Sequence, residues 1–361
     1  MRILAFGGKG GVGKSTISTA TAVKLAKIAP DKKVLLISFD IAHNLSDIFS
    51  IEVGNDLTKI FDNLYAIEPD PEVYAEEYTR EFAQKTRALM KTMPIVGLMP
   101  QLNEFIDKTF VSKSIPLALK NAMFFQRILD ADSTIDELGE KEDSFNQIKF
   151  DYVVCDFPPT GNMVALFEIP QDQVQVVMKS MLQTMGQVKE MMKGIKKLTK
   201  FFNPFAWGSS PEEKNLSKEI VEMLYEIERR GERVSEMMRT EGSLRLVTIA
   251  EKPSFEEIKR AWEMTKKYIQ LDGVHINRIT PRKYTDDCEM CRVQRANQDK
   301  YLAEIQASFT DVKIWTSHRL LVAPIGIDGL LNLADEVYGP NVTLDEILFP
   351  KGNPEQKLEI S

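Results

Sequence analysis

The sequence predicts an α/β fold in which a doubly wound, mostly parallel sheet carries an inserted helical subdomain. Three observations lead to this prediction. Short runs of branched apolar residues alternate with helical stretches, a glycine-rich loop directly follows the first run, and two long helical segments interrupt the alternation. Ligands of such sheets bind at the carboxyl ends of the strands, so the residues that follow each strand form the candidate site.

The apolar runs have the continuous hydrophobic character of strands that are buried on both faces of a sheet. Helical stretches lie between them, and parallel strands need such crossover connections. We expect five strands, at residues 3–6, 34–38, 152–155, 244–249 and 274–276.

Two segments, residues 70–145 and 164–240, are helical in pattern and show no recurrent strand signal. Each is too long to be an ordinary crossover. We therefore predict one helical subdomain built from these two insertions. The remaining residues, 1–69, 146–163 and 241–361, would form the sheet core.

Composition limits the function classes. The 361 residues carry a formal net charge of −7, whereas a broad nucleic-acid-binding face is basic, so we expect no nucleic-acid partner. Three cysteines cannot form a disulfide framework, no charged and apolar leader precedes the first strand, and no apolar run is long enough to span a bilayer. These features predict a cytoplasmic protein.

The glycine-rich loop has the spacing of a phosphate-binding loop (P-loop): glycine, four residues, then glycine, lysine and serine. Its backbone N–H groups would turn inward on the phosphates of a nucleotide. Lys14 would reach the β- and γ-phosphates, and Ser15 would ligate Mg²⁺. A glycine-rich turn without a ligand is the alternative. The predicted ATP-binding set in this region is Gly8, Lys9, Gly10, Gly11, Val12, Gly13, Lys14, Ser15 and Thr16.

Two carboxylates end predicted strands. Asp40 follows the strand at 34–38, and Asp156 follows the strand at 152–155, so both should emerge at the phosphate edge of the sheet. A carboxylate there can hold Mg²⁺ through its waters or orient the water that attacks the γ-phosphate. The alternative role of each is a helix cap or a turn residue. The sequence therefore predicts a P-loop NTPase core.

Cys288 and Cys291 have the spacing of half a zinc site, because two thiolates leave a tetrahedral site half empty. Cys155 is expected in the core, and the chain has no second pair. Two copies of the pair across a symmetric dimer axis are the simplest completion. A reduced or redox-active pair without metal is the alternative.

Methionines recur at three- and four-residue steps within the second insertion, among lysines, as in a basic amphipathic helix. Such a helix usually packs into a subdomain core. Methionine is flexible and polarizable, however, and suits grooves that accept varied apolar ligands. The predicted groove residues are Met178, Met181, Met185 and Met192.

The chain resembles the arsenical-pump and tail-anchored-protein-targeting ATPase family in three segments: the string GGKGGVGKST, residues 40–47 and residues 156–162. The resemblance implies that Asp40 and Lys14 are catalytic and that Asp156 lies on the magnesium side. It also implies that Lys9 is catalytic: it crosses a dimer interface to the partner's nucleotide and acts there as an arginine finger would. Two residues depart from the family pattern, Ile41 in place of proline and Asn162 in place of histidine.

Weaker landmarks follow in the family's order. Glu251 resembles a nucleotide-contacting glutamate, Asn277 an adenine-reading asparagine, and Pro324 with Ile325 an adenine-side loop. The Cys288–Cys291 pair resembles that of the targeting branch, which implies one Zn²⁺ per dimer. Four residues after the pair also match that branch in spacing: Gln298, Lys300, Tyr301 and Leu302.

The resemblance implies a homodimeric, Mg²⁺-dependent ATPase that binds the transmembrane helices of tail-anchored proteins and releases them at a membrane receptor. Such a protein is cytoplasmic and transiently membrane-associated. The short segment before the first strand favours an archaeal member. Three alternatives stay open: an arsenite-stimulated subunit of an efflux pump, a partitioning ATPase and a nucleotide-independent holdase chaperone.

Overall fold

The computed structural model describes residues 1–40, 45–70, 126–132, 148–164, 167 and 231–351, with a few single helical positions between them. The chain divides into two compact units. The first comprises Met1–Asp70, Arg127–Phe167 and Ser235–Ser361, and the second comprises Pro71–Gln126 and Glu168–Val234. The described residues lie almost entirely in the first unit. That the two insertions form a helical subdomain which binds transmembrane helices therefore stays a prediction.

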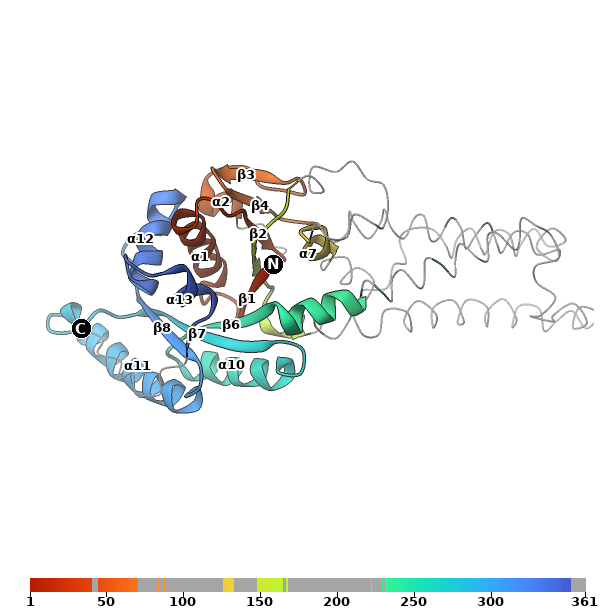
Figure 1. Cartoon of the computed structure of the whole chain (residues 1–361). Coiled ribbons are helices and arrows are strands. Elements are labelled where there is room, and N and C mark those ends of the chain that lie inside the picture. The colour runs from red at the N-terminus through yellow and green to blue at the C-terminus, as the bar shows by residue number, and fades with distance from the viewer. Residues whose placement is uncertain are drawn as a thin grey trace, which may run out of the picture. The chain divides into compact units, whose positions relative to one another are not determined.

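The first unit is built on a single eight-stranded sheet with the order β3-β4-β2-β5-β1-β6-β7-β8 (Figure 1). Every neighbouring pair is parallel except β3 with β4. The chain moves from β1 to one side of the sheet and later returns to the other, so the strand order reverses at β1, where doubly wound folds bind ligands. The strands are β1 (Arg2–Gly8), β2 (Val34–Ser38), β3 (Thr58–Phe61), β4 (Leu64–Ile67), β5 (Tyr152–Asp156), β6 (Gly242–Ile249), β7 (Gln270–Ile279) and β8 (Lys313–His318).

Helices cover the two faces of this sheet (Figure 1). One face carries α1 (Lys14–Ile28), α2 (Leu45–Phe49), α12 (Gly326–Tyr338) and α13 (Leu344–Leu348), and the other carries α10 (Lys252–Thr265) and α11 (Glu289–Ser308). A 3₁₀ turn, η5 (Arg282–Tyr284), precedes α11, a short helix, α7 (Gln126–Asp130), lies before β5, and residues 160–164 and 231–240 are also helical.

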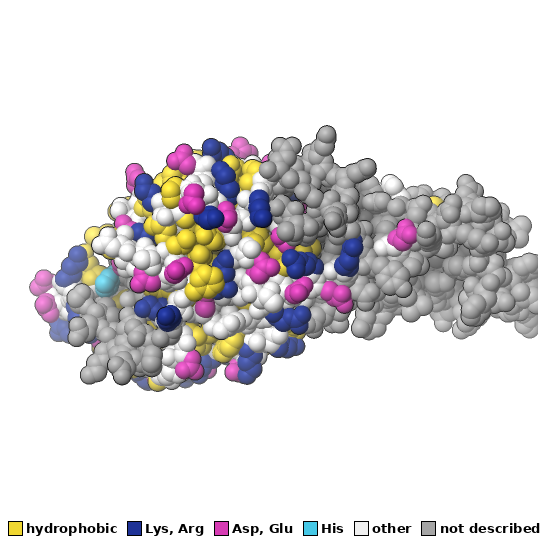
Figure 2. All heavy atoms as spheres, in the orientation of Figure 1, with side chains coloured by type: hydrophobic (Ala, Val, Ile, Leu, Met, Phe, Trp, Pro, Cys, Tyr) yellow, Lys and Arg dark blue, Asp and Glu magenta, His cyan; other side chains and the backbone are white. Residues whose placement is uncertain are grey.

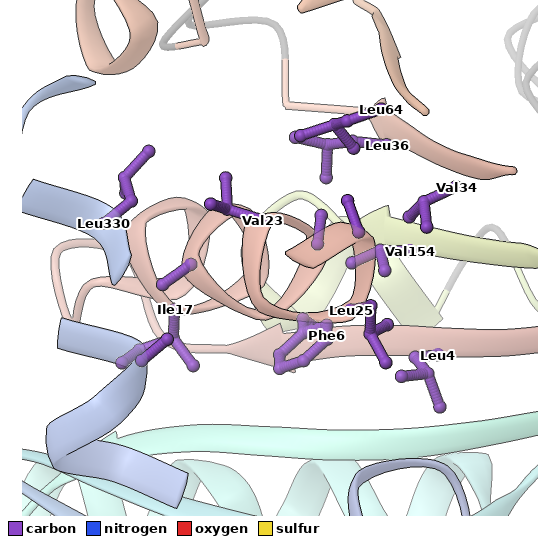
Figure 3. Close-up of a cluster of buried hydrophobic side chains, with 14 of the residues drawn as sticks. Leu4, Phe6, Ile17, Val23, Leu25, Val34, Leu36, Leu64, Val154 and Leu330 are labelled. Carbon is purple, nitrogen blue, oxygen red and sulfur yellow. The ribbon is translucent and has the colours of Figure 1, made fainter. Parts of the chain in front are cut away.

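A cluster of buried hydrophobic side chains lies between the sheet and α1 (Figure 3). Eleven of the fifteen residues of α1 are buried, which is why this central helix shows no one-sided apolar stripe. Ile17, Val23 and Leu25 contribute to this cluster together with Leu4 and Phe6 of β1. Each such side chain stabilises the fold by about 1.5–3 kcal/mol. The core therefore fixes the P-loop between its rigid strand and helix.

The predicted fold class and all five predicted strands are confirmed. Three strands were missed. β3 and β8 are the edge strands of the sheet, and each has only two neighbouring apolar residues beside polar ones. β4 is apolar throughout but is only four residues long. Edge strands need less burial and leave a weaker pattern.

On the face drawn in Figure 2, acidic and basic side chains alternate with small hydrophobic groups. Neither sign of charge dominates that face. Among the helices of the described residues, none is long and apolar enough to cross a membrane.

Candidate functional site

The loop between β1 and α1 has the geometry of a phosphate cradle. Gly8 and Gly13 have positive φ angles of 147° and 96°, a conformation that side chains disfavour. A Cβ at Gly8 would also collide with the carbonyl oxygen of Val247 on β6, and one at Gly13 with the side-chain amide of Asn277. The glycines are thus required by backbone conformation and by close packing. The N-terminus of α1 points its free N–H groups at the space above the loop.

The two lysines of the loop lie in different environments. Lys14 begins α1 and is only 4% exposed, whereas Lys9 is exposed on the loop. Among the described residues, the Lys14 ammonium makes no ion pair, and a buried cation of that kind calls for an anion. A nucleotide phosphate fits this need. Lys9 is free to reach outside its own chain.

Asp156 ends β5 between β1 and β2, opposite Phe6 and Ser38 in the sheet register. Its side chain is completely buried, and neither carboxylate oxygen accepts a well-formed hydrogen bond from the described residues. Burial raises its pKa to about 7, although the nearby Ser15 hydroxyl and the Lys14 charge act in the opposite direction. An orphaned buried carboxylate beside Ser15 fits Mg²⁺, which prefers oxygen ligands.

Asp40 lies two residues beyond the end of β2, at the same edge of the sheet. Its charge is close enough to Asp156 to contribute to the raised pKa of that carboxyl. The segment after β5 turns back over the loop, since Pro159 is the nearest side chain to Gly10. The structure therefore brings Asp40, Asp156, Lys14 and Ser15 together, as the sequence predicts. Ile41 lies outside the described residues, and Asn162 is exposed.

The sequence model of the anion-transporting ATPase family matches residues 1–339. The chain belongs to this family. It is 30% identical to arsenical pump-driving ATPase 2 of Aquifex aeolicus over 314 residues, which is 87% of this chain and 91% of the relative. It is 27% identical over 361 residues to the ATPase get3 of Aspergillus niger, covering 98% of this chain and 93% of the relative. An arsenical pump-driving ATPase of Chlorobaculum tepidum is 28% identical over 352 residues, covering 94% and 76%.

The chain is therefore an ATPase that uses a nucleotide and Mg²⁺. The loop, Lys14, Ser15, Asp156 and Asp40 would have different roles in binding and hydrolysis. The loop N–H groups and Lys14 would hold the phosphates, and Ser15 with Asp156 would hold Mg²⁺, which neutralises phosphate charge when bound. Asp40, less buried than Asp156, would orient the attacking water.

The predicted adenine-side residues of the ATPase differ in exposure and in the contacts that they make. Glu251 stands at the N-cap position of α10 after β6, makes no capping hydrogen bond with its side chain and is exposed. Pro324 and Ile325 lie in the loop between β8 and α12, where Ile325 is 54% exposed. Asn277 is only 7% exposed, and its amide donates to the carbonyl oxygen of Val12 at 2.9 Å. Asn277 lies within β7, which extends beyond the predicted strand at 274–276, and its side chain binds the loop itself.

Cys288 and Cys291 lie at the start of α11, where the Cys288 sulfur accepts a hydrogen bond from the Cys291 backbone N–H at 3.3 Å. That bond and others lower the pKa of Cys288. Within the described part of the chain, no third ligand joins them to form a metal-binding group. Cys155 is completely buried in β5, as predicted, and burial raises the pKa of its thiol.

The groove residues Met178, Met181, Met185 and Met192 lie outside the described residues. Sequence reasoning also missed contacts around the loop. Ser317 on β8 donates to Asn277, and Met163 fills the space beside Gly7. No spacing in the sequence links these residues, because each pair is more than a hundred residues apart or joins separate strands.

Replacing Asp156 with asparagine is expected to stabilise the nucleotide-free protein and to abolish Mg²⁺-dependent hydrolysis. The folded-state pKa of about 7 lies above the ordinary value of 3.8. The ionised carboxylate thus destabilises the fold above pH 7, and the wild-type protein gains stability as the pH falls from 8 toward 5. At pH 8 the variant should melt a few degrees higher, and its melting temperature should depend less on pH. Calorimetry from pH 5 to 8 measures both effects, and a variant less stable than wild type at pH 8 would contradict the assignment.

Proposed function

We propose that this ATPase is a homodimer that binds the transmembrane helices of tail-anchored membrane proteins and releases them at a membrane receptor after ATP hydrolysis. Two features of one chain support the proposal, an exposed lysine on the phosphate loop and a pair of partly exposed thiols. Lys9 is exposed on the loop while Lys14 is buried beneath it, and the thiol pair has no third ligand among the described residues. A second copy of the chain would complete both.

The thiol pair suits one half of a shared zinc site. Both cysteines are partly exposed at a helix start. Hydrogen bonds with Cys291 lower the pKa of Cys288 and favour its thiolate, the form that binds Zn²⁺, whereas the bond between the two side chains raises the pKa of Cys291. Two copies related by a two-fold axis supply four thiolates in total. One Zn²⁺ per dimer would then join the two chains at α11.

Metal analysis of the purified ATPase should find about one zinc per two chains, as four thiolates fill one tetrahedral site. Cys288→Ser should lose the metal and shift the protein toward monomer in light scattering. Cys155→Ala is the matched control, since that thiol is buried in the core. Dimers that contain no zinc would contradict the proposed metal site.

We infer a transmembrane helix as the bound client from the family resemblance and from the methionine-rich insertion. The relative named ATPase get3 supports the targeting branch of the family. Nucleotide binding at the dimer interface would close the two chains, and their helical subdomains would form one apolar groove with Met178, Met181, Met185 and Met192. Hydrolysis would loosen the groove because the two nucleotide states differ in client affinity. The protein would work in the cytoplasm and meet the membrane only at release.

A second candidate is the ATPase subunit of an arsenite pump, which is favoured by the relatives named as arsenical pump-driving ATPases. Arsenite contains arsenic(III), a soft acceptor to which thiolates bind as ligands. The chain has three cysteines, and the buried Cys155 with its raised pKa is a poor donor. Stimulation by arsenite would therefore depend on Cys288 and Cys291.

Co-expression with a tail-anchored membrane protein separates the two candidates. The proposal predicts a soluble complex that copurifies with the ATPase and depends on the client's transmembrane helix. Arsenite should leave the rate of hydrolysis unchanged. Absence of the complex, together with arsenite-stimulated hydrolysis that Cys288→Ser removes, would reverse the assignment.

A further inference from the structure

The C-terminal end of β7 contains a strained residue close to the phosphate loop. Arg278 has a φ of 59°, in the left-handed region that residues other than glycine seldom adopt. The pairing of β7 with β8 loses its register here, between Ile276 and Ile279. Such a conformation costs about 1–3 kcal/mol and persists only where neighbouring groups hold it.

Gln298 of α11 holds this turn from both sides. Its side chain is 3% exposed. Its carbonyl oxygen accepts from the backbone N–H of Thr280 at 2.9 Å, and its amide donates to the backbone oxygen of Arg278 at 3.1 Å. Because one end accepts while the other donates, the amide can take only one orientation. Arg295, one turn earlier on α11, donates to the Thr280 oxygen at 2.7 Å. We call the Gln298 side chain with its two backbone partners the glutamine clamp.

The strained turn directs the Asn277 side chain. The backbone N–H of Arg278 donates to the side-chain oxygen of Asn277 at 2.8 Å, and the Ser317 hydroxyl donates to the same oxygen at 2.8 Å. With its oxygen occupied by two donors, the Asn277 amide points its nitrogen at the loop. There it donates to the Val12 oxygen at 2.9 Å.

Anchoring the Val12 oxygen fixes the peptide unit that joins Val12 to Gly13. The described residues contain no cis peptide bond, and in a trans peptide the C=O and the following N–H point in opposite directions. Holding the carbonyl on the Asn277 side therefore turns the Gly13 N–H to the other side, away from β7. The N–H groups of such a loop cradle phosphate. A freely rotating peptide would lose one of these donors.

We propose that Gln298 is a positioning residue for nucleotide binding. It acts through the Arg278 turn and Asn277 to set the Val12–Gly13 peptide of the phosphate loop. The clamp lies on α11, the helix that begins at the thiol pair, beside β7 and β8 (Figure 1). This role concerns nucleotide affinity in the ATPase and does not depend on the client or on zinc.

The test replaces Gln298 with leucine, which keeps the bulk and removes both hydrogen bonds. ADP affinity measured by calorimetry should fall about fivefold, because a lost hydrogen bond is worth about 1 kcal/mol and the loop loses the support of the clamp. The kcat at saturating ATP should change less than the affinity. Asn297→Leu, at an exposed neighbouring position of the same helix, is the matched control and should bind ADP as the wild type does.

A second change distinguishes positioning from general stability. Glycine adopts the left-handed conformation without strain, so adding Arg278→Gly to Gln298→Leu should restore most of the ADP affinity. A Gln298→Leu protein that melts earlier but binds ADP within twofold of wild type would overturn the proposal, as would a double variant with no recovery. If Gln298→Leu does not fold, Gln298→Glu serves instead, since it keeps the acceptor and loses the donor.

Discussion

Replacing Asp40 with asparagine is expected to lower the kcat for ATP hydrolysis at least about 100-fold, the usual contribution of a positioned general base. Asp40 lies beyond β2, close to Asp156 and at the edge where the phosphate loop opens. An amide has the same shape as the carboxylate but cannot accept the proton of the attacking water. Binding of ADP should therefore stay within a few-fold of the wild-type value.

Steady-state hydrolysis and ADP calorimetry on the same preparation check this result. Asp31→Asn is the control, because Asp31 is an exposed carboxylate in the turn at the opposite end of β2. Hydrolysis that survives in Asp40→Asn would remove Asp40 from the catalytic assignment.

Replacing Lys9 with alanine is expected to lower kcat about 1,000-fold, at the lower end of the range for arginine fingers. Lys9 is exposed, and its charge would reach the nucleotide of the partner chain, where it would offset the charge that develops on the transferred phosphoryl group. Lys27→Ala, an exposed lysine in the last turn of α1, is the control. Full activity in Lys9→Ala would show that this lysine is only a solvated loop residue.

The parts of this site that the sequence predicts are those set by neighbours in the chain. The P-loop spacing places Lys14 and Ser15 at a helix start, and a carboxylate directly after an apolar run locates Asp156 at the sheet edge. Both predictions depend on strand and helix geometry alone, so the structure reproduces them.

The contacts that orient the loop could not be predicted in this way. The Asn277 side chain contacts Val12, which is 265 positions away in the sequence. Gln298 binds the backbone of Arg278, and the left-handed conformation of Arg278 cannot be predicted from its residue type. The contact of the Asn277 amide with the loop was not predicted, and it arises because two donors occupy the side-chain oxygen. Side-chain direction depends on such tertiary contacts, whereas strand position does not.

The central claim is that two chains share each active site, and a mixed dimer tests it most directly. Chains carrying Lys9→Ala and Asp40→Asn, each with a different tag, can be co-expressed and purified through both tags. If Lys9 acts on the partner's nucleotide, the Lys9→Ala chain keeps its own Asp40 and receives an intact lysine, so the mixed dimer should recover about half of wild-type activity, one of two symmetric sites. A mixed dimer as inactive as the two parent variants would contradict the account.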